Sequence, residues 1–266
     1  MKKYVNNWQG FKVHNYEFDG TKELCNYVRR VPLNTRRFTQ SMVKDYGSDG
    51  SDKTFQGGGW YKTKNLRQAI KLCENGWNEG FDFFKSLKKS LEATGDRIYI
   101  FPADETDTVN LFVNLSYNWQ TTEKAIVNRG VIVQNLIRQL EENYYKVNLN
   151  AFSMNFCGCE ICNVVVKLKD KNEKLDPKKA YFAFCNPSFL RRLVFRIIES
   201  TDLKEKEWTE NYGYPCDSDT IKSFFKTDKI DIVIPQSSEI GIKGDSINED
   251  WKTFLKYANL SKYFND

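Results

Sequence analysis

The segment 111–169 constrains the fold of this 266-residue chain most, because its hydrophobic pattern changes from strand to helix and back to strand. Residues 109–115 form a nearly continuous apolar run broken only by asparagines, which is typical of a strand buried on both faces. Thr121 or Thr122 can cap the helix that follows and that extends to about Asn143. The segment therefore predicts a strand–helix–strand–strand unit.

The last two strands of this unit are expected to form a hairpin. Val147 and Leu149 alternate with polar residues, and the alternation shifts by one residue at 151–152. Such a shift predicts a β-bulge, because one extra residue moves every following side chain to the other face. Residues 157–162 provide a tight connection, and residues 163–168 return as the second strand.

Shorter elements surround this unit and set the fold class. Strands are predicted at residues 11–18, 97–101 and 229–234, and helices at residues 21–31, 63–75, 81–91, 176–185, 186–198 and 251–260. Strands alternating with helices predict an α/β fold with a central mixed sheet flanked by helices. We expect an N-terminal α+β extension, residues 1–95, packed on an α/β core domain, residues 96–266. Gly130 costs its helix about 1 kcal/mol relative to alanine, so we expect close packing against the sheet there.

Composition excludes several protein classes. The 40 basic and 35 acidic residues give a net charge of +5, a mixture typical of a solvated surface and not of a nucleic-acid footprint. No stretch approaches the roughly 20 apolar residues of a membrane helix, and the N-terminus lacks the apolar region of a signal peptide. Seven cysteines are an odd number, as expected for free thiols in a reducing compartment. We therefore expect a cytoplasmic protein with no membrane partner.

Catalytic chemistry has little support in the sequence. His14 is the only histidine, and no G-x-S-x-G motif provides a serine nucleophile for it. Carboxylates are plentiful, but no pair is distinguished by its setting. We therefore expect a non-enzymatic protein.

The densest cluster of metal-binding side chains is Cys157, Cys159 and Cys162, at the predicted hairpin tip. Three thiolates within six residues can bind zinc if a fourth ligand comes from elsewhere. Candidates for that ligand are Cys216, Glu160 and His14. The other interpretation is that small residues simply fill a tight turn. We therefore expect no cofactor, with zinc as the alternative.

Asn114, Ser116 and Asn118 close the first strand of the unit, where open α/β sheets bind their ligands. The spacing resembles the D-x-S-x-S metal site of the von Willebrand factor A-like domain, which implies a core of that type. Asparagine stands in place of both the aspartate and the last serine. Because Mg²⁺ prefers anionic oxygen ligands, the resemblance implies a degenerate junction, with magnesium binding as an alternative. A second alternative is that these side chains only cap the next helix.

Basic residues offer a further alternative, nucleic-acid binding. Residues 167–179 hold six lysines and three acids, and three arginines follow at helical spacing. The candidate contacts are Lys167, Lys169, Lys171, Arg191, Arg192 and Arg196. The alternative is an ordinary solvated hairpin and helix face.

Several stretches in a fixed order resemble a family of uncharacterised proteins encoded by tailed bacteriophages and prophages. They occupy roughly residues 38–219 and include Leu66-Arg67-Gln68-Ala69-Ile70, Val113-Asn114-Leu115-Ser116, Asn128-Arg129-Gly130 and Asn186-Pro187-Ser188-Phe189-Leu190. The resemblance implies a phage origin, no established activity, and a location in the host cytoplasm or the virion. The hypothesis that fits these observations best is a module that binds a host or phage protein.

Overall fold

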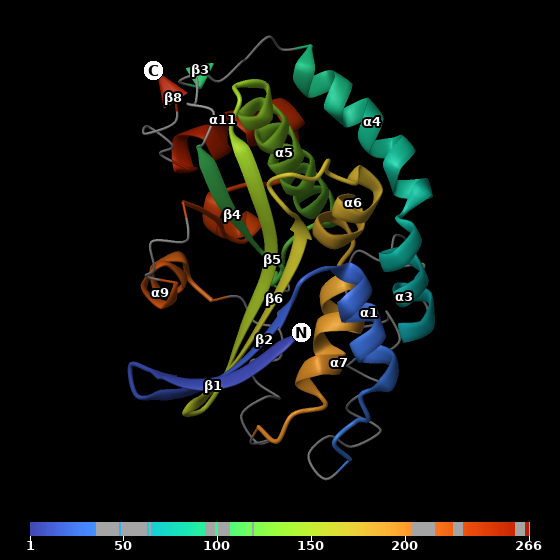
Figure 1. Cartoon of the computed structure of the whole chain (residues 1–266). Helices are drawn as coiled ribbons and strands as arrows, with labels where there is room; N and C mark the ends of the chain where they lie inside the picture. The colour runs from blue at the N-terminus through green and yellow to red at the C-terminus, as the bar shows by residue number, and fades with distance from the viewer. Residues whose placement is uncertain are drawn as a thin grey trace.

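The computed structural model describes residues 1–35, 48, 63, 65–93, 99–100, 107–118, 120–203, 216–225, 231–258 and 264–265. Six strands form one sheet in the order β1-β2-β6-β5-β4-β7 (Figure 1). Their bounds are Lys2–Trp8 (β1), Phe11–Phe18 (β2), Thr108–Asn114 (β4), Lys146–Cys157 (β5), Glu160–Lys169 (β6) and Ile232–Ile234 (β7). β1 pairs antiparallel with β2, and β5 pairs antiparallel with β6. The other three pairings are parallel. The expected mixed sheet flanked by helices is confirmed.

The strand–helix–strand–strand unit is present as β4, α5 (Glu123–Glu142), β5 and β6. Thr122 is the N-cap of α5, and its side-chain oxygen accepts a hydrogen bond from the Ala125 amide at 3.2 Å. This bond satisfies one of the amides left unpaired at a helix start. The predicted strand, helix and cap are confirmed.

The N-terminal residues are part of the same sheet. β1 and β2 are joined by Gln9 and Gly10, whose φ angles of 48° and 85° suit a two-residue hairpin turn. β2 then pairs in parallel with β6, so the sheet crosses the boundary expected between residues 95 and 96. The division into extension and core stays a prediction.

Helices cover both faces of the sheet (Figure 1). Their bounds are Thr21–Arg30 (α1), Leu66–Asn75 (α3), Asn78–Glu92 (α4), Pro177–Cys185 (α6), Phe189–Val194 (η3, a π-helix), Phe195–Ile198 (α7), Ser218–Phe224 (α9), Ser237–Ile240 (α10) and Ile247–Ala258 (α11). The larger core lies between one sheet face and the helices α1, α3, α5, α6 and α7. The smaller core lies on the other face under α9 and contains Val13, Phe152, Met154, Ile161 and Ile221. A separate two-stranded sheet joins β3 (Tyr99–Ile100) to β8 (Phe264–Asn265).

The expected bulge at residues 151–152 is wrong. The register of β5 against β6 shifts between Leu149 and Asn150 instead, where Leu168 is the unpaired extra residue. β5 is buried on both faces in its second half, so its hydrophobic pattern changes because the strand contributes first to the larger core and then to the smaller one. The shift in hydrophobic alternation therefore marks the point where β5 begins to contribute to the smaller core, and it does not mark a bulge.

Gly130 is a close-packing position, but its neighbour is a helix and not the sheet. A Cβ atom built on Gly130 would lie 2.1 Å from Cys185 Sγ and 3.3 Å from Phe184 Cβ, both on α6. The glycine therefore allows α5 and α6 to approach each other. Among the residues that the structure describes, no helix is long and apolar enough to cross a membrane.

Candidate functional site

The junction after β4 uses its polar side chains to build its own turns. Asn114 Oδ1 accepts from the Ser116 amide at 2.9 Å, and Asn118 Oδ1 accepts from the Gln120 amide at 3.1 Å. Ser116 Oγ lies 3.1 Å from Ser153 Oγ on the neighbouring strand β5. The structure thus brings the three predicted residues into one junction, but their oxygens already serve as acceptors or partners within the protein.

A buried cation adjoins this junction. Arg129 of α5 is fully buried, and its guanidinium donates to the Pro235 carbonyl at 2.7 Å and to the Tyr117 hydroxyl at 3.0 Å. Tyr117 lies between Ser116 and Asn118 in the sequence, and its own hydroxyl donates to the Phe184 carbonyl at 2.8 Å. The Tyr117 hydroxyl thus links the buried guanidinium of Arg129 to the backbone of α6.

The start of α5 is closed by another loop of the protein. Thr122 Oγ1 donates to the Lys243 carbonyl at 3.2 Å, and a Cβ atom on Gly244 would lie 2.4 Å from the Ala125 amide nitrogen. Asp250 fixes this loop by accepting from the Lys243 and Gly244 amides, each at 2.9 Å. The helix N-terminus, a common anion site, is therefore occupied by protein.

The cysteine hairpin divides its thiols between core and surface. Cys157 and Cys162 are buried and Cys159 is exposed. Burial raises the pKa of the Cys162 thiol well above its ordinary value, which disfavours the thiolate that zinc requires. Cys216 lies in the smaller core, where its Sγ is 3.7 Å from Met154 Sδ.

The other two candidate zinc ligands meet at this hairpin. His14 Nε2 lies 3.4 Å from Glu160 Oε1. Within the described ranges, no three His, Cys, Asp or Glu side chains are grouped as a metal site. The pairing of His14 with Glu160 explains both side chains without a metal.

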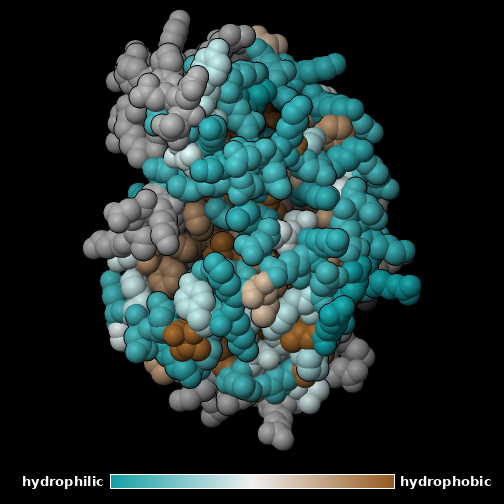
Figure 2. Space-filling model, in the orientation of Figure 1, coloured by the Kyte–Doolittle hydropathy of each residue, from teal (hydrophilic) through white to brown (hydrophobic). Residues whose placement is uncertain are grey.

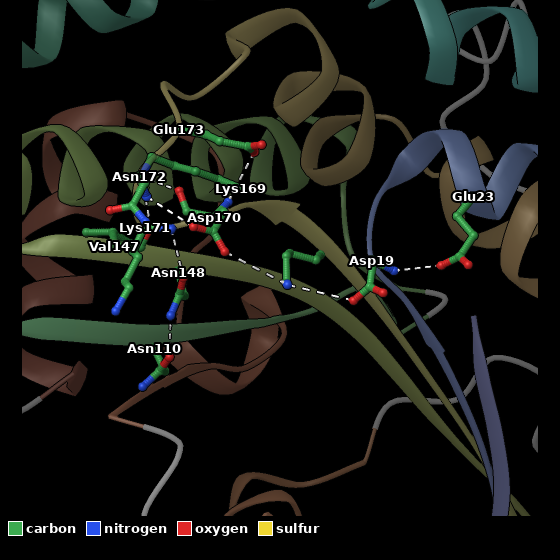
Figure 3. A network of polar contacts seen from close by, with 11 residues as sticks. Asp19, Glu23, Asn110, Val147, Asn148, Lys169, Asp170, Lys171, Asn172 and Glu173 are labelled. Carbon is green, nitrogen blue, oxygen red and sulfur yellow. Dashed lines mark hydrogen bonds and ion pairs between the residues drawn. The ribbon is translucent and has the colours of Figure 1, made fainter.

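The predicted lysines belong to a network of polar contacts, and of the three only Lys169 is buried (Figure 3). Lys169 has a side chain that is only 1% exposed, and its Nζ lies 2.9 Å from both the Val147 carbonyl and a Glu141 carboxylate oxygen. Lys167 lies 3.7 Å from Asp19 and 4.0 Å from Asp170. Lys169 is therefore a structural residue, and Lys167 is already paired with acids.

The remaining cations are dispersed. The Lys171 amide donates to Asn148 Oδ1 at 2.8 Å, while its side chain is exposed. Arg192 is 1% exposed, and Arg191 and Arg196 are half-buried. Figure 2 shows a mainly hydrophilic face on which hydrophobic residues form small separate patches. The six predicted contacts do not gather into one exposed basic surface.

The sequence prediction missed the strand β1, which is the most exposed element of the sheet. Its residues from Lys2 to Asn7 are all exposed, with Tyr4 44% and Val5 52% accessible. In a two-residue hairpin the residues beside the turn form a hydrogen-bonded pair, which here is Trp8 with Phe11. Hydrogen-bonded pairs recur at every second residue of an antiparallel pair, so the even-numbered residues of β1 form the backbone hydrogen bonds to β2.

The backbone N–H and C=O groups of Lys3, Val5 and Asn7 consequently point away from β2. β1 is the terminal strand of the described sheet, so these six groups form an open edge. Aromatic residues on both sides of Gln9-Gly10 were the sequence signal that would have identified this hairpin.

A row of asparagine side chains runs across the sheet to this edge. Asn163 Nδ2 on β6 donates to Asn15 Oδ1 on β2 at 3.0 Å, and Asn15 Nδ2 donates to Asn6 Oδ1 on β1 at 2.7 Å. Asn15 and Asn163 are buried, whereas Asn6 is exposed. This asparagine row links the edge strand to the inner strands by side-chain hydrogen bonds.

Comparisons with known proteins give one family and no relative of known activity. A family model described as a domain of unknown function, DUF7192, matches residues 102–262, more than half of the chain. No curated protein matches the chain. No solved structure matches it. The matched region contains the β4–α5–β5–β6 unit and the junction after β4, and the β1–β2 hairpin precedes it. On this match, the chain belongs to the DUF7192 family of unknown function.

Proposed function

We propose that this protein is a bacteriophage-encoded, non-enzymatic module that binds another protein, in the infected cell or as a component of the virion. The observation that carries the proposal is the open edge of β1. Exposed edge strands pair with strands of other proteins, and most folds protect them with a bulge, a proline, charged side chains or a covering segment. The charged residues of β1, Lys2 and Lys3, both lie at one end of the strand. β1 is seven residues long and contains no proline, and none of its pairings with β2 is irregular.

The phage origin rests on the ordered sequence resemblance and is part of the proposal. We further propose that the β4–α5 junction descends from a von Willebrand factor A-like metal site that has lost its charge. Asn114 supports this idea because it occupies the position of the acid, and the Arg129 guanidinium nearby provides a fixed positive charge.

The two alternatives have weaker support. A metal-dependent enzyme would need free oxygen ligands at the junction, where Asn114 and Asn118 already accept backbone hydrogen bonds. A nucleic-acid surface would need accessible cations, and Lys169 and Arg192 are buried.

The proposal is tested with two variants at one residue. Val5→Pro removes an outward N–H and leaves the bonds between β1 and β2 intact, because proline is tolerated where the N–H faces solvent. Val5→Thr is the matched control, since it keeps the N–H and suits a strand. Both proteins and the wild type are tagged at the C-terminus and used to capture partners from phage-infected cells.

The proposal predicts a partner that wild type and Val5→Thr retain and that Val5→Pro loses at least tenfold. Equal capture by all three proteins would contradict it. Sedimentation with purified phage particles then separates the two locations: co-sedimentation indicates a virion component, and absence from particles indicates a role in the cell.

A further inference from the structure

We infer that the open edge of β1 binds an acidic extended segment of the partner protein, which adds as a seventh strand of the sheet. This inference rests on the proposed function and specifies the chemistry of its partner. Three features of β1 carry it: the direction of its backbone groups, the charges along it, and the end of the asparagine row.

The backbone requires an extended partner. The free N–H and C=O groups of Lys3, Val5 and Asn7 repeat every second residue, about 7 Å apart in a strand. Only another strand presents complementary groups at this spacing. An antiparallel partner is favoured, because antiparallel pairing is slightly more stable per residue than parallel pairing.

The charges of β1 require acids on that partner. Lys2 and Lys3 are adjacent, so their side chains lie on opposite faces of the sheet, and β1 contains no acid. Neither lysine forms an ion pair with a described residue, although Lys3 Nζ lies 5.2 Å from the centre of the Tyr16 ring. Glu17 on β2 stands directly opposite Lys2, and its carboxylate accepts a hydrogen bond from the Tyr4 hydroxyl at 2.6 Å. With one carboxylate against two lysines, this end of the edge stays net positive, which favours carboxylates on the added strand.

The asparagine row adds a hydrogen-bond donor in the middle of the edge. Asn6 uses its Oδ1 to accept from Asn15, so its exposed Nδ2 group is left to donate. On the other face, Val5 presents an apolar side chain that is 52% exposed. The complementary strand thus has a polar acceptor opposite Asn6, an apolar residue opposite Val5, and acids near Lys2 and Lys3.

In the antiparallel orientation, the acids fall at the C-terminal end of the bound segment. A second copy of this chain is a poorer occupant, because two β1 strands would bring four lysines to one interface without an acid. We therefore infer that the strand added at the edge of β1 comes from a different protein and is acidic.

The test uses two fluorescent eight-residue peptides with capped ends. Both contain the same alternation of aliphatic β-branched residues with threonines. One peptide ends in two glutamates and the other in two lysines. Binding to the full chain is measured by anisotropy at low salt. We expect the acidic peptide to bind at least tenfold more tightly than the basic one, and Val5→Pro to weaken its binding at least tenfold while Val5→Thr has little effect.

The double variant Lys2→Glu/Lys3→Glu keeps the test decisive if Val5→Pro does not fold. Both substitutions lie on an exposed strand, and we expect them to reverse the preference toward the basic peptide. Equal binding of both peptides, or binding of neither, would overturn the inference. So would a dimer of the wild type, measured by analytical ultracentrifugation, that Val5→Pro dissolves.

Failure of the inference and failure of the proposed function give different results. If neither peptide binds but capture of a cellular partner still depends on the Val5 amide, the acidic strand is wrong and the interaction module stands. If capture is unaffected by Val5→Pro, the interaction through β1 itself is wrong.

Discussion

Replacing Gly130 by alanine tests the contact between α5 and α6, on which the larger core depends. In a helix interior alanine is favoured over glycine by about 1 kcal/mol, so the substitution alone would stabilise an isolated helix. Here the new Cβ atom would lie 2.1 Å from Cys185 Sγ, whereas ordinary contacts are about 3.5–4.0 Å. Cys185 is fully buried, so its thiol cannot move without displacing other core atoms.

Overpacking of this kind costs about 1–3 kcal/mol, which equals or exceeds the gain in helix propensity. We expect Gly130→Ala to lower the free energy of unfolding by up to about 2 kcal/mol, the difference between these two terms. Cys185→Ala removes the blocking atom at a cost of about 1 kcal/mol. In the Cys185→Ala background, Gly130→Ala should then become neutral or stabilising.

The four proteins of this cycle are compared by urea unfolding followed by circular dichroism. The predicted coupling energy between the two positions is about 1–3 kcal/mol, the steric cost that the double variant avoids. A coupling energy below about 0.5 kcal/mol would refute the reasoning, because it would show that α5 and α6 do not meet at this point.

Three other substitutions or reactions test the polar structure. Lys169→Met should destabilise the protein by about 2–4 kcal/mol in urea unfolding, because it leaves buried carbonyl groups without their charged donor, while Lys169→Arg should cost less. Burial raises the pKa of Glu123 from 4.5 to about 7, so its contribution to stability is complete below pH 4.5 and is lost as the pH rises through 7. Glu123→Gln should therefore raise the melting temperature relative to wild type more at pH 8 than at pH 5, and an equal change at both would contradict the assignment. Cys159 should be the one thiol of the seven that reacts rapidly with a thiol reagent in the folded protein, as mass spectrometry of the labelled peptides can show.

The central unit was predictable because local signals agree there. The apolar run of β4, the threonine cap of α5 and the alternation at the start of β5 all indicate the same elements, and the structure confirms them. Pairing partners were not predictable in the same way. The parallel pairing of β2 with β6 joins residues about 150 positions apart, and no local pattern encodes it.

Local signals failed where tertiary contacts decide the outcome. The sequence predicts that Thr63 caps the helix at residues 63–75, but α3 begins after Asn65, whose side chain accepts from the Gln68 amide at 2.9 Å. Lys169 carries the same charge as its exposed neighbours, but a register irregularity in β6 turns its side chain into the polar network of Figure 3. The sequence also contains three consecutive glycines, residues 57–59, and a predicted turn, Tyr212-Gly213-Tyr214-Pro215, and both lie outside the described residues.

The candidate site shows the same division. Sequence spacing placed Asn114, Ser116 and Asn118 at one strand end, which is where they lie. It did not reveal that Arg129 would occupy the neighbouring space, because that contact arises from the packing of α5. β1 was missed because its residues have no hydrophobic alternation, which is itself a consequence of their exposure.

The open edge of β1 is tested most directly by amide hydrogen exchange of the full chain, with and without its captured partner. In the free protein we predict rapid exchange at Lys3, Val5 and Asn7 and slow exchange at Tyr4 and Asn6, because only the even-numbered amides bond to β2. Addition of the partner should slow exchange at the three odd-numbered amides. Uniform protection of β1 in the free protein, or no change when the partner binds, would contradict the account.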